Sequence, residues 1–434
     1  MLCQQKYQGM DGMARLPVLL MSAAVLALGG CGPKPEVAAA AAEPEGLADD
    51  WYVFSANPGG SIQTGLNLHQ TKYGWQGRIW QGDKMYPVRN LVVADGAMSF
   101  IVPALELSWS AKEEVAHKWR GAWTSKASET PAVMGASNPP DLGGKTFVTL
   151  QDGRQMYLDC RGHGSPAVIF DAGAGGTTAS WRLVHDEIAK TTLACAYDRA
   201  GHGLSDPRPL PLDVANVADD LDAMLAAGVP APYVLVGHSL GSYHVRQYAN
   251  TRFDKMAGMV LVDPSGDGQG ARFAAEIPKA YAALEKEQEK GKEANCAVKL
   301  REKLVMRDDP LFGACNGTND ADMFEQTQSE IDSMEGFSME ELTKSKRSYG
   351  AMPLIVLTRG DYKKGMPPWF GDNDRAGMKK VWVAMHEEMT ALSTAGELRT
   401  VAGAGHNIQS DQPQAVIDAV NEVVAKARGG AAKP

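Results

Sequence analysis

The feature that most constrains the fold is the short segment Gly237-His-Ser-Leu-Gly241, between an apolar run and a helix-favouring run. Tyr233 to Val236 is typical of a buried strand, and Ser242 to Asn250 of a helix. In that context G-x-S-x-G indicates a sharp strand-to-helix turn, because the glycines allow a backbone that lifts the central side chain clear of the sheet. We therefore expect Ser239 to be an exposed nucleophile.

Strands and helices alternate on both sides of this turn. Apolar runs without polar alternation are expected where helices cover both faces of a parallel sheet. Further strands are predicted at Thr146 to Leu150, Met156 to Cys160, Ala167 to Phe170, Leu193 to Tyr197, Met259 to Val262, Pro353 to Leu357 and Leu398 to Val401. Residues 145–434 therefore predict an α/β domain with a mostly parallel, doubly wound sheet, and the charged segment 265–350 predicts a helical lid.

A serine hydroxyl needs a base that can accept its proton, and histidine is suited to this near neutral pH. His406 lies in a glycine-rich loop directly after the last predicted strand. We expect it to be that base. His163 and His202 lie in earlier loops, and His238 adjoins Ser239, so we interpret these three as structural.

Two carboxylates compete to orient the imidazole of His406. Asp263 stands directly at the tip of the strand Met259 to Val262, whereas Asp361 follows the strand Pro353 to Leu357. Both keep the chain order serine, acid, histidine. We favour Asp263 and keep Asp361 as the alternative.

Negative charge on a tetrahedral intermediate requires two backbone N–H donors. One is expected from Leu240, after the serine, and the other from Ala174 in the loop Asp171-Ala-Gly-Ala-Gly-Gly176. No Lys-Ser/Thr follows this loop, as a phosphate-binding loop would need, and no H-E-x-x-H is present. We expect neither a cofactor nor a metal.

With these residues assembled, the chain from about Lys145 onward resembles the α/β-hydrolase superfamily. The motifs that carry the resemblance stand in the expected order: Ala167-Val-Ile-Phe-Asp-Ala-Gly-Ala-Gly-Gly176, Tyr197-Asp-Arg-Ala-Gly-His-Gly-Leu-Ser205, Gly237-His-Ser-Leu-Gly241 and Gly405-His406. The resemblance is to esterase-like members and implies cofactor-free hydrolysis of a small-molecule ester or related acyl substrate by a serine hydrolase. A serine at the turn argues against dehalogenase or epoxide hydrolase chemistry, which uses aspartate there.

Two other functions are alternatives to ester hydrolysis. A prolyl-type aminopeptidase on the same fold would need lid carboxylates for its substrate amine, and the lid offers Glu276, Glu285, Glu287, Glu289 and Glu293. A charge run at helical spacing is also typical of a solvated face. The other alternative is a non-catalytic surface-binding lipoprotein, against which an intact serine, acid and histidine set counts.

The N-terminus predicts export. Arg15 precedes the apolar run Leu16 to Leu28, which is shorter than a membrane span needs, so residues 1–30 indicate a signal peptide. Leu28-Gly-Gly-Cys31 resembles the bacterial lipobox, which implies a lipid anchor at Cys31 in the cell envelope. A plain secretory signal is the alternative. Residues 31–46 are rich in Pro, Ala and Glu and predict a flexible tether.

Short alternating runs over residues 47–127 predict a small antiparallel β-module, and residues 128–144 predict a linker because they hold prolines, glycines and few apolar side chains. The module contains six of the nine tryptophans. We interpret them as its core rather than as an aromatic platform for glycans.

Charge and cysteines complete the prediction. The net charge of −9, without long blocks of one sign, disfavours nucleic acid as a partner. Export permits disulfides. We expect a bridge between Cys296 and Cys315 within the lid. Cys160 and Cys195 lie on strands that the resemblance implies are neighbours, and they fit either a bridge or two buried thiols.

Overall fold

A computed structural model describes residues 50–57, 60–81, 84–115, 118–125, 129–136, 145–293, 295–302, 305–315 and 318–430. The predicted signal peptide (1–30), Cys31 and the tether (31–46) lie outside the described residues. Among the helices of the described part, none combines the length and the apolar character that a membrane span needs.

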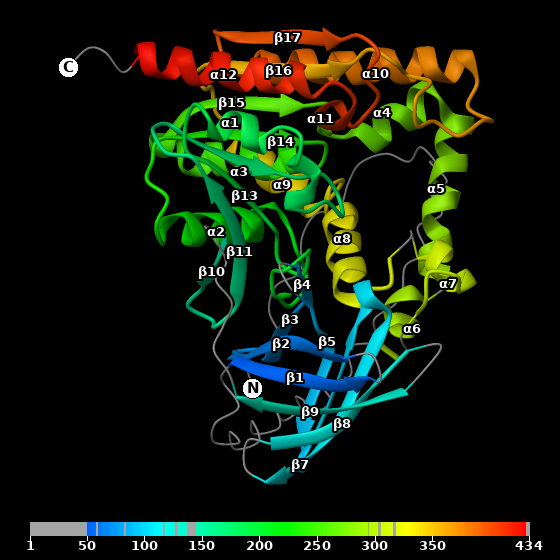
Figure 1. The fold of residues 1–434 in the computed structure, drawn as a ribbon. Helices are drawn as coiled ribbons and strands as arrows, with labels where there is room; N and C mark the ends of the chain where they lie inside the picture. Colours follow the sequence, from blue (N-terminus) through cyan, green and yellow to red (C-terminus); the bar gives the residue numbers. More distant parts are fainter. Residues whose placement is uncertain are drawn as a thin grey trace, which may run out of the picture. The chain divides into compact units, whose positions relative to one another are not determined.

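The larger sheet, here called the C-terminal sheet, has the order β10-β11-β13-β12-β14-β15-β16-β17 (Figure 1). Its first strands, β10 and β11, are antiparallel to their neighbours, and the strands from β13 to β17 run parallel. The strands are β10 Lys145–Thr149, β11 Gln155–Arg161, β12 Ala167–Asp171, β13 Ala194–Tyr197, β14 Tyr233–His238, β15 Met256–Val262, β16 Leu354–Arg359 and β17 Gly396–Val401. This confirms the predicted mostly parallel α/β sheet.

Helices cover both faces of the C-terminal sheet. They are α1 His185–Ala189, α2 Val214–Ala226, α3 Gly241–Thr251, α10 Asp372–Thr390, α11 Ile408–Asp411 and α12 Pro413–Gly430. Leu235 packs in one core with α2, α3 and α10, and its neighbour Val236 packs in the opposite core with α1 and α12. Burial on both faces explains why β14 is apolar without alternation.

The lid lies between β15 and β16 in the chain. Its helices are α4 Gln269–Glu276, α5 Pro278–Glu293, α6 Cys296–Glu302, α7 Pro310–Ala314, α8 Ala321–Ser333 and α9 Phe337–Ser345. A disulfide joins Cys296, at the start of α6, to Cys315, directly after α7. A second disulfide joins Cys160 and Cys195, which stand opposite each other on β11 and β13.

The smaller sheet, here called the N-terminal sheet, is antiparallel and has the order β4-β3-β2-β1-β9-β8-β7-β6-β5 in the described residues. Its strands are β1 Asp50–Asn57, β2 Gly60–Thr71, β3 Gly74–Gln81, β4 Lys84–Pro87, β5 Arg89–Ala94, β6 Ala97–Val102, β7 Leu107–Val115, β8 Lys118–Thr124 and β9 Glu129–Ala136. The end strands β4 and β5 follow one another in the chain, so the sheet curls back on itself. Trp109, Trp119 and Trp123 are buried in its core.

The predicted boundary between this module (47–127) and a linker (128–144) was wrong. The strand β9 lies inside the predicted linker and pairs with both β1 and β8. Residues 128–144 hold three prolines and three glycines, and Pro131 itself lies in the strand. Pairing on two sides is a non-local contribution that composition does not reveal, and here it outweighs local propensity.

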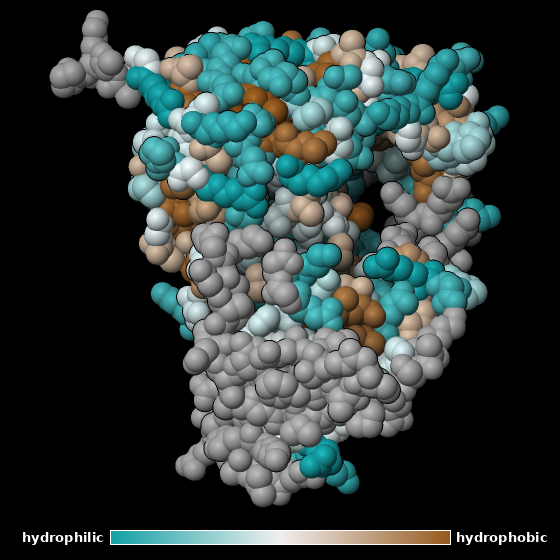
Figure 2. Space-filling view, in the orientation of Figure 1, coloured by the Kyte–Doolittle hydropathy of each residue, from teal (hydrophilic) through white to brown (hydrophobic). Residues whose placement is uncertain are grey.

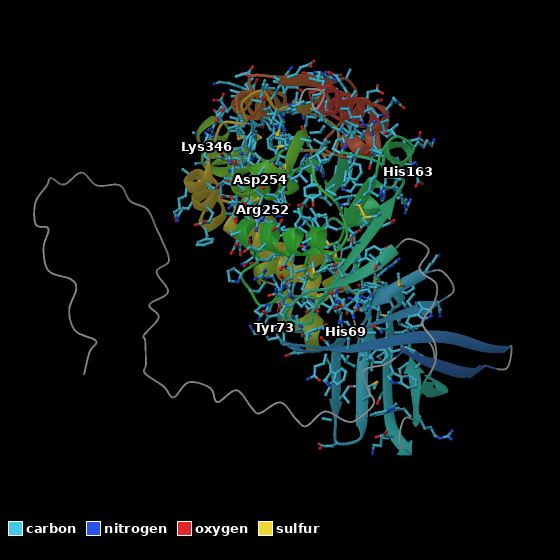
Figure 3. The ribbon with its side chains drawn as sticks, turned by 90° about the vertical axis from the view of Figure 1, so that its left-hand side faces the viewer. His69, Tyr73, His163, Arg252, Asp254 and Lys346 are labelled. Carbon is cyan, nitrogen blue, oxygen red and sulfur yellow. A yellow bond between two sulfur atoms is a disulfide. The ribbon has the colours of Figure 1, made fainter. Side chains whose placement is uncertain are left out.

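Buried polar contacts join the N-terminal sheet to the C-terminal domain. Asp206, in the loop after β13, accepts a hydrogen bond from Arg78 of β3 at 2.9 Å, and His69 of β2 contacts its other carboxylate oxygen. Figure 3 labels His69 on these strands. Burial alone would raise the pKa of Asp206, but the Arg78 charge and His69 hold it below its usual value. The module is therefore attached by a charged contact.

Candidate active site

Ser239 occupies the turn between β14 and α3, with φ at +51°. This left-handed conformation is uncommon for a residue other than glycine and marks a strained turn. Gly241 permits the close packing behind it, because a Cβ there would lie 2.6 Å from the carbonyl oxygen of Ala172. The predicted strand-turn-helix geometry is therefore present.

His406 lies in the loop between β17 and α11, where it reaches Ser239. Its Nε2 is 2.9 Å from Ser239 Oγ, and its Nδ1 is 2.6 Å from Asp263 Oδ2. The loop is held by His238, whose Nε2 donates to the carbonyl oxygen of His406 at 2.9 Å. Three side chains from distant parts of the sequence thus form one continuous hydrogen-bond chain, the arrangement that activates a serine.

Of the two acid candidates, the structure brings Asp263 to His406 and not Asp361. Asp361 is solvent-facing, and its carboxylate accepts the backbone N–H groups of Lys363 and Lys364 at 2.8 and 3.2 Å. These two bonds lower the pKa of Asp361. Asp361 therefore stabilises the turn that it begins. The order of residues along the chain does not distinguish this role from that of an acid beside His406.

The Asp263 carboxylate is fully buried and accepts several further hydrogen bonds. Arg359 donates from its backbone N–H at 2.9 Å and from Nε at 2.6 Å, and Trp382 donates from Nε1 at 2.9 Å. Burial alone would raise the pKa of Asp263, but the hydrogen bond with His406 and the charge of Arg359 hold it well below its usual value. Asp263 is therefore ionised at neutral pH.

Arg359 and Trp382 were not predicted from the sequence. The sequence offered one weak signal: Arg359 is the last residue of β16 and its only charged one. Trp382 lies within α10 and carries no local sign of its contact with Asp263. Residues such as Arg359 and Trp382 can be identified as hydrogen-bond donors to Asp263 only from the folded structure.

The two predicted oxyanion donors adjoin the nucleophile. Leu240 follows Ser239 and precedes α3. The loop that holds Ala174 approaches from β12, and a Cβ at Gly173 would lie only 3.2 Å from Ser239 Cβ. The backbone of both segments therefore lies close enough to contact a group attached to Ser239.

None of the three histidines that were interpreted as structural is hydrogen-bonded to the Ser239 hydroxyl in the described residues, where His406 makes that contact. His202 is buried and contacts the carbonyl oxygen of Ala200 and the hydroxyl of Thr327. His163 is exposed at the periphery in Figure 3. Burial, followed by the charge of His406, lowers the pKa of His238 to about 3, so this side chain is neutral at physiological pH.

A cavity of about 900 Å³ opens onto Ser239 and His406. Figure 2 shows the surface hollowed between α5 and α8, which contribute to its lining. Its apolar lining includes Phe273, Leu284, Met334, Met366 and Trp382. Its acidic lining includes Glu285, Asp332 and Glu335. The cavity can hold a medium-sized substrate with its reacting group at Ser239.

Known proteins with similar sequences and structures point to one family. A model described as "Alpha/beta hydrolase family" matches residues 168–419, more than half of the chain. The chain is 25% identical over 283 residues to the uncharacterized protein YqjL of Bacillus subtilis (strain 168), covering 64% of this chain and 91% of that protein. It is 24% identical over 335 residues to the sn-1-specific diacylglycerol lipase ABHD11 of Mus musculus, covering 71% and 99%.

A solved structure of haloalkane dehalogenase DbeA from Bradyrhizobium elkani USDA94 has the same fold, with a TM-score of 0.50 and 16% identity. The match covers 66% of this chain and 99% of the dehalogenase chain. At this identity the likeness concerns the fold alone. The family match and this fold likeness agree with the mostly parallel α/β sheet described above. The chain is therefore a hydrolase that belongs to the α/β-hydrolase family.

Proposed function

We propose that the protein is a serine hydrolase that cleaves a carboxylic ester, or a related acyl bond, through a covalent acyl-enzyme. The observation that carries this proposal is the hydrogen-bond chain from Ser239 through His406 to the buried Asp263. These three side chains adjoin a cavity whose mixed wall includes the apolar side chains of Phe273, Leu284 and Met334, which suit the acyl part of an ester. The diacylglycerol lipase among the relatives supports ester substrates as a class.

In this mechanism Ser239 Oγ attacks the acyl carbon while His406 Nε2 accepts the hydroxyl proton. The ionised Asp263 stabilises the imidazolium, and the N–H groups of Leu240 and Ala174 stabilise the negative oxygen. The bond to the leaving alcohol breaks as His406 returns the proton to its oxygen. Water then attacks the acyl-enzyme with His406 as base, which releases the acid and restores Ser239.

A prolyl-type aminopeptidase is the second candidate, because one of the predicted lid carboxylates lines the cavity. Glu285 stands there together with Asp332 and Glu335, where a substrate amine could meet them. Glu276 instead pairs with Lys380 at 2.7 Å. The side chains of Glu287, Glu289 and Glu293 lie outside the described residues.

A direct test compares p-nitrophenyl esters of increasing acyl length with the p-nitroanilides of proline and alanine. We expect the wild type to hydrolyse esters and to be labelled by a fluorophosphonate at Ser239. Ser239→Ala and His406→Ala should each lower kcat by roughly 10⁴-fold or more, because members of such a set act as a unit. Ser410→Ala, an exposed serine outside the cavity lining, is the matched control.

Three outcomes of this test distinguish the ester hydrolase from the aminopeptidase and from a non-catalytic protein. Faster cleavage of the anilides than of the esters would favour the aminopeptidase. Labelling of Ser239→Ala at the wild-type rate would contradict Ser239 as nucleophile. Equal, negligible hydrolysis by wild type and Ser239→Ala would instead favour the non-catalytic, surface-binding lipoprotein.

We also propose that the protein is exported and anchored to the bacterial cell envelope through a lipid on Cys31. The lipobox-like sequence carries this proposal, and the two disulfides of the C-terminal domain support an oxidising compartment. Cys31→Ser should move the protein from the membrane fraction to the soluble fraction and abolish incorporation of labelled palmitate. Unchanged membrane association of a palmitate-free wild type would contradict the anchor.

A further inference from the structure

A buried cluster of charges lies behind the loop that holds Ala174. At its centre is Arg199, from the segment after β13, and only about 2% of its side chain is exposed. Its ion-pair partners, Asp171 at the end of β12 and Glu330 in the lid helix α8, are fully buried. The proposed mechanism gives these groups no role, although burying them is costly unless every one is paired.

Arg199 makes its hydrogen bonds in two opposite directions. Toward the loop, Nη1 donates to Asp171 Oδ1 at 2.8 Å and to the carbonyl oxygen of Ala172 at 2.7 Å, and Nη2 donates to the carbonyl oxygen of Gly173 at 2.9 Å. Toward the lid, Nε donates to Glu330 Oε1 at 2.6 Å and Nη2 to Oε2 at 3.1 Å. The planar guanidinium therefore fixes the loop relative to α8.

The contact with Gly173 determines the direction of a catalytically important N–H. The peptide bond between Gly173 and Ala174 is trans, so the carbonyl of Gly173 and the N–H of Ala174 point in opposite directions. The carbonyl is held on the buried side by Arg199 and by the backbone N–H of Gly176 at 3.0 Å. The N–H of Ala174 is consequently directed away from the buried cluster, on a loop that lies against Ser239.

Glu330, the partner of Arg199 on the lid helix α8, lies next to residues that line the cavity. Glu330 is followed in the chain by Ile331 and Asp332, which line the cavity over Ser239. The same turn of α8 thus contacts the substrate space with one face and Arg199 with another. We infer that Arg199 and Glu330 are positioning residues, which couple the seating of the lid helix α8 to the orientation of the oxyanion-binding Ala174 peptide.

Two histidines complete the cluster. His244 lies between the carboxylates, with Nδ1 3.2 Å from Asp171 Oδ2 and Nε2 4.0 Å from Glu330 Oε1. His202 Nε2 lies 3.7 Å from Glu330 Oε2. Burial alone would raise the pKa of Glu330, but the charge of Arg199 outweighs it and holds the pKa below its usual value. Glu330 is therefore a carboxylate, and its bonds to Arg199 are charge-assisted.

This inference rests on the proposed serine hydrolase function, and Glu330→Gln tests it by removing the charge while keeping the shape. With the p-nitrophenyl ester that the wild type cleaves best, kcat should fall about 10- to 100-fold, because loss of a whole oxyanion donor costs about 10²- to 10³-fold. KM should stay within about twofold, since the ground-state ester makes little use of the oxyanion donors.

A second measurement separates positioning from general damage. A trifluoromethyl ketone forms a tetrahedral oxyanion with Ser239, whereas the carboxylic acid product does not. In Glu330→Gln the inhibition constant of the ketone should rise by the same factor by which kcat/KM falls, and that of the product should stay within about twofold. A merely structural role would not separate these two ligands.

The matched control is another buried, bidentate pair of arginine and carboxylate, formed by Arg154 and Asp220 at 2.8 and 2.7 Å. Asp220→Asn should lower thermal stability without changing kcat, because the ion pairs of Arg154 and Asp220 are with each other, Asp152 and Arg208, and neither residue lines the cavity. Glu330→Asp keeps the charge on a shorter side chain and should give a kcat between wild type and Glu330→Gln. If Glu330→Gln does not fold, Glu330→Asp replaces it: its kcat should fall more than twofold and the ketone should weaken more than the product, and a kcat within twofold of wild type would overturn the inference.

The inference is overturned if folded Glu330→Gln keeps kcat within twofold of wild type. It is equally overturned if Asp220→Asn loses as much kcat, or if the ketone and the product weaken by the same factor. These results leave an active, Ser239-dependent wild type in place. A wild type without Ser239-dependent hydrolysis defeats the proposed function and this inference together.

Discussion

The two sheets of the molecule bury their side chains in different ways and hold different kinds of residue at their strand ends. In the C-terminal sheet, β14, β15 and β16 have buried side chains along both faces, and the residues directly after β14 and β15 are Ser239 and Asp263. Both have a positive φ. In the N-terminal sheet, the buried face of β6 alternates with a more exposed one, and the core contains large aromatic rings.

The difference follows from strand direction. Neighbouring strands of a parallel sheet end at the same edge, so loops far apart in sequence converge there and their polar side chains can meet. Neighbouring antiparallel strands end at opposite edges and are joined by short turns. Convergence brings together Ser239, Asp263 and His406, whereas the hairpins of the N-terminal sheet build a core. We therefore expect mutations in the two sheets to change different quantities.

The largest effect is expected at the strand tips of the C-terminal sheet. Asp263→Asn should lower kcat by about 10⁴-fold, because an amide neither stabilises the imidazolium nor selects the correct tautomer of His406. Asp361→Asn should change kcat by less than about twofold, since its side chain faces solvent. Steady-state kinetics on an ester checks both variants. The opposite ranking of Asp263 and Asp361 would transfer the acid role to Asp361.

The same pair of aspartates illustrates what the sequence could predict. Ser239 and His406 were predictable because each lies in a local motif with a fixed relation to its strand. Asp263 and Asp361 both follow a strand and both precede His406 in the chain, so only burial and the donors around Asp263 distinguish them. That information is non-local.

Two further features depended on the assembled fold. Glu330 lies in a charged segment that resembles a solvated helix face, and it is buried only because Arg199, 131 positions away, meets it. The strand β9 was predicted as linker because proline and glycine are frequent in its segment, although its pairing with β1 and β8 fixes it. Periodicity predicted most strands, while buried polar partners and a proline-containing strand required the structure.

The next largest effect is expected in the core of the N-terminal sheet. Trp109 is 1% exposed and packs against Trp123, with ring centroids 5.1 Å apart. Trp109→Ala should lower the free energy of unfolding by about 3–5 kcal/mol through the lost burial and the cavity. Urea denaturation measures this, and kcat per folded molecule should stay at the wild-type value. Val92→Ala, at a 55% exposed position, is the control and should cost less than about 0.5 kcal/mol.

A loss of kcat in folded Trp109→Ala would break the comparison, because it would mean that the N-terminal sheet contributes to the chemistry and not only to stability.

A smaller effect is expected in the lid, which sheet pairing does not hold. The disulfide between Cys296 and Cys315 closes a loop of sequence separation 19, and its loss through Cys296→Ser with Cys315→Ser should cost about 3 kcal/mol in the chain-entropy model. Urea denaturation of the double variant measures this cost. Non-reducing peptide mapping of envelope-purified protein should recover the peptides linked by this disulfide. Quantitative alkylation of Cys296 and Cys315 without reductant would contradict the disulfide.

For a change of one pH unit, the smallest effect is expected at the site end of the C-terminal sheet, where His238 and His386 are buried as neutral side chains. Burial, followed by the charge of His406, lowers the pKa of His238 to about 3, whereas an unfolded histidine titrates near 6.5. Between about pH 3 and 6.5 the unfolded chain therefore binds a proton that the folded chain does not. His238 contributes stability that is present above pH 6.5 and is lost as the pH falls, with a slope of about 1.4 kcal/mol per pH unit.

His238→Gln should reduce that slope, because glutamine does not titrate and its amide can still donate to the carbonyl of His406. Burial likewise lowers the pKa of His386 to about 4, so His238→Gln combined with His386→Gln should flatten the pH dependence further between about pH 4 and 6.5. Urea denaturation at half-unit steps of pH measures the slopes. If both variants keep the wild-type slope, these histidines are not the neutral, buried groups that stabilise the strand ends near Ser239, and acid sensitivity must arise elsewhere in the molecule.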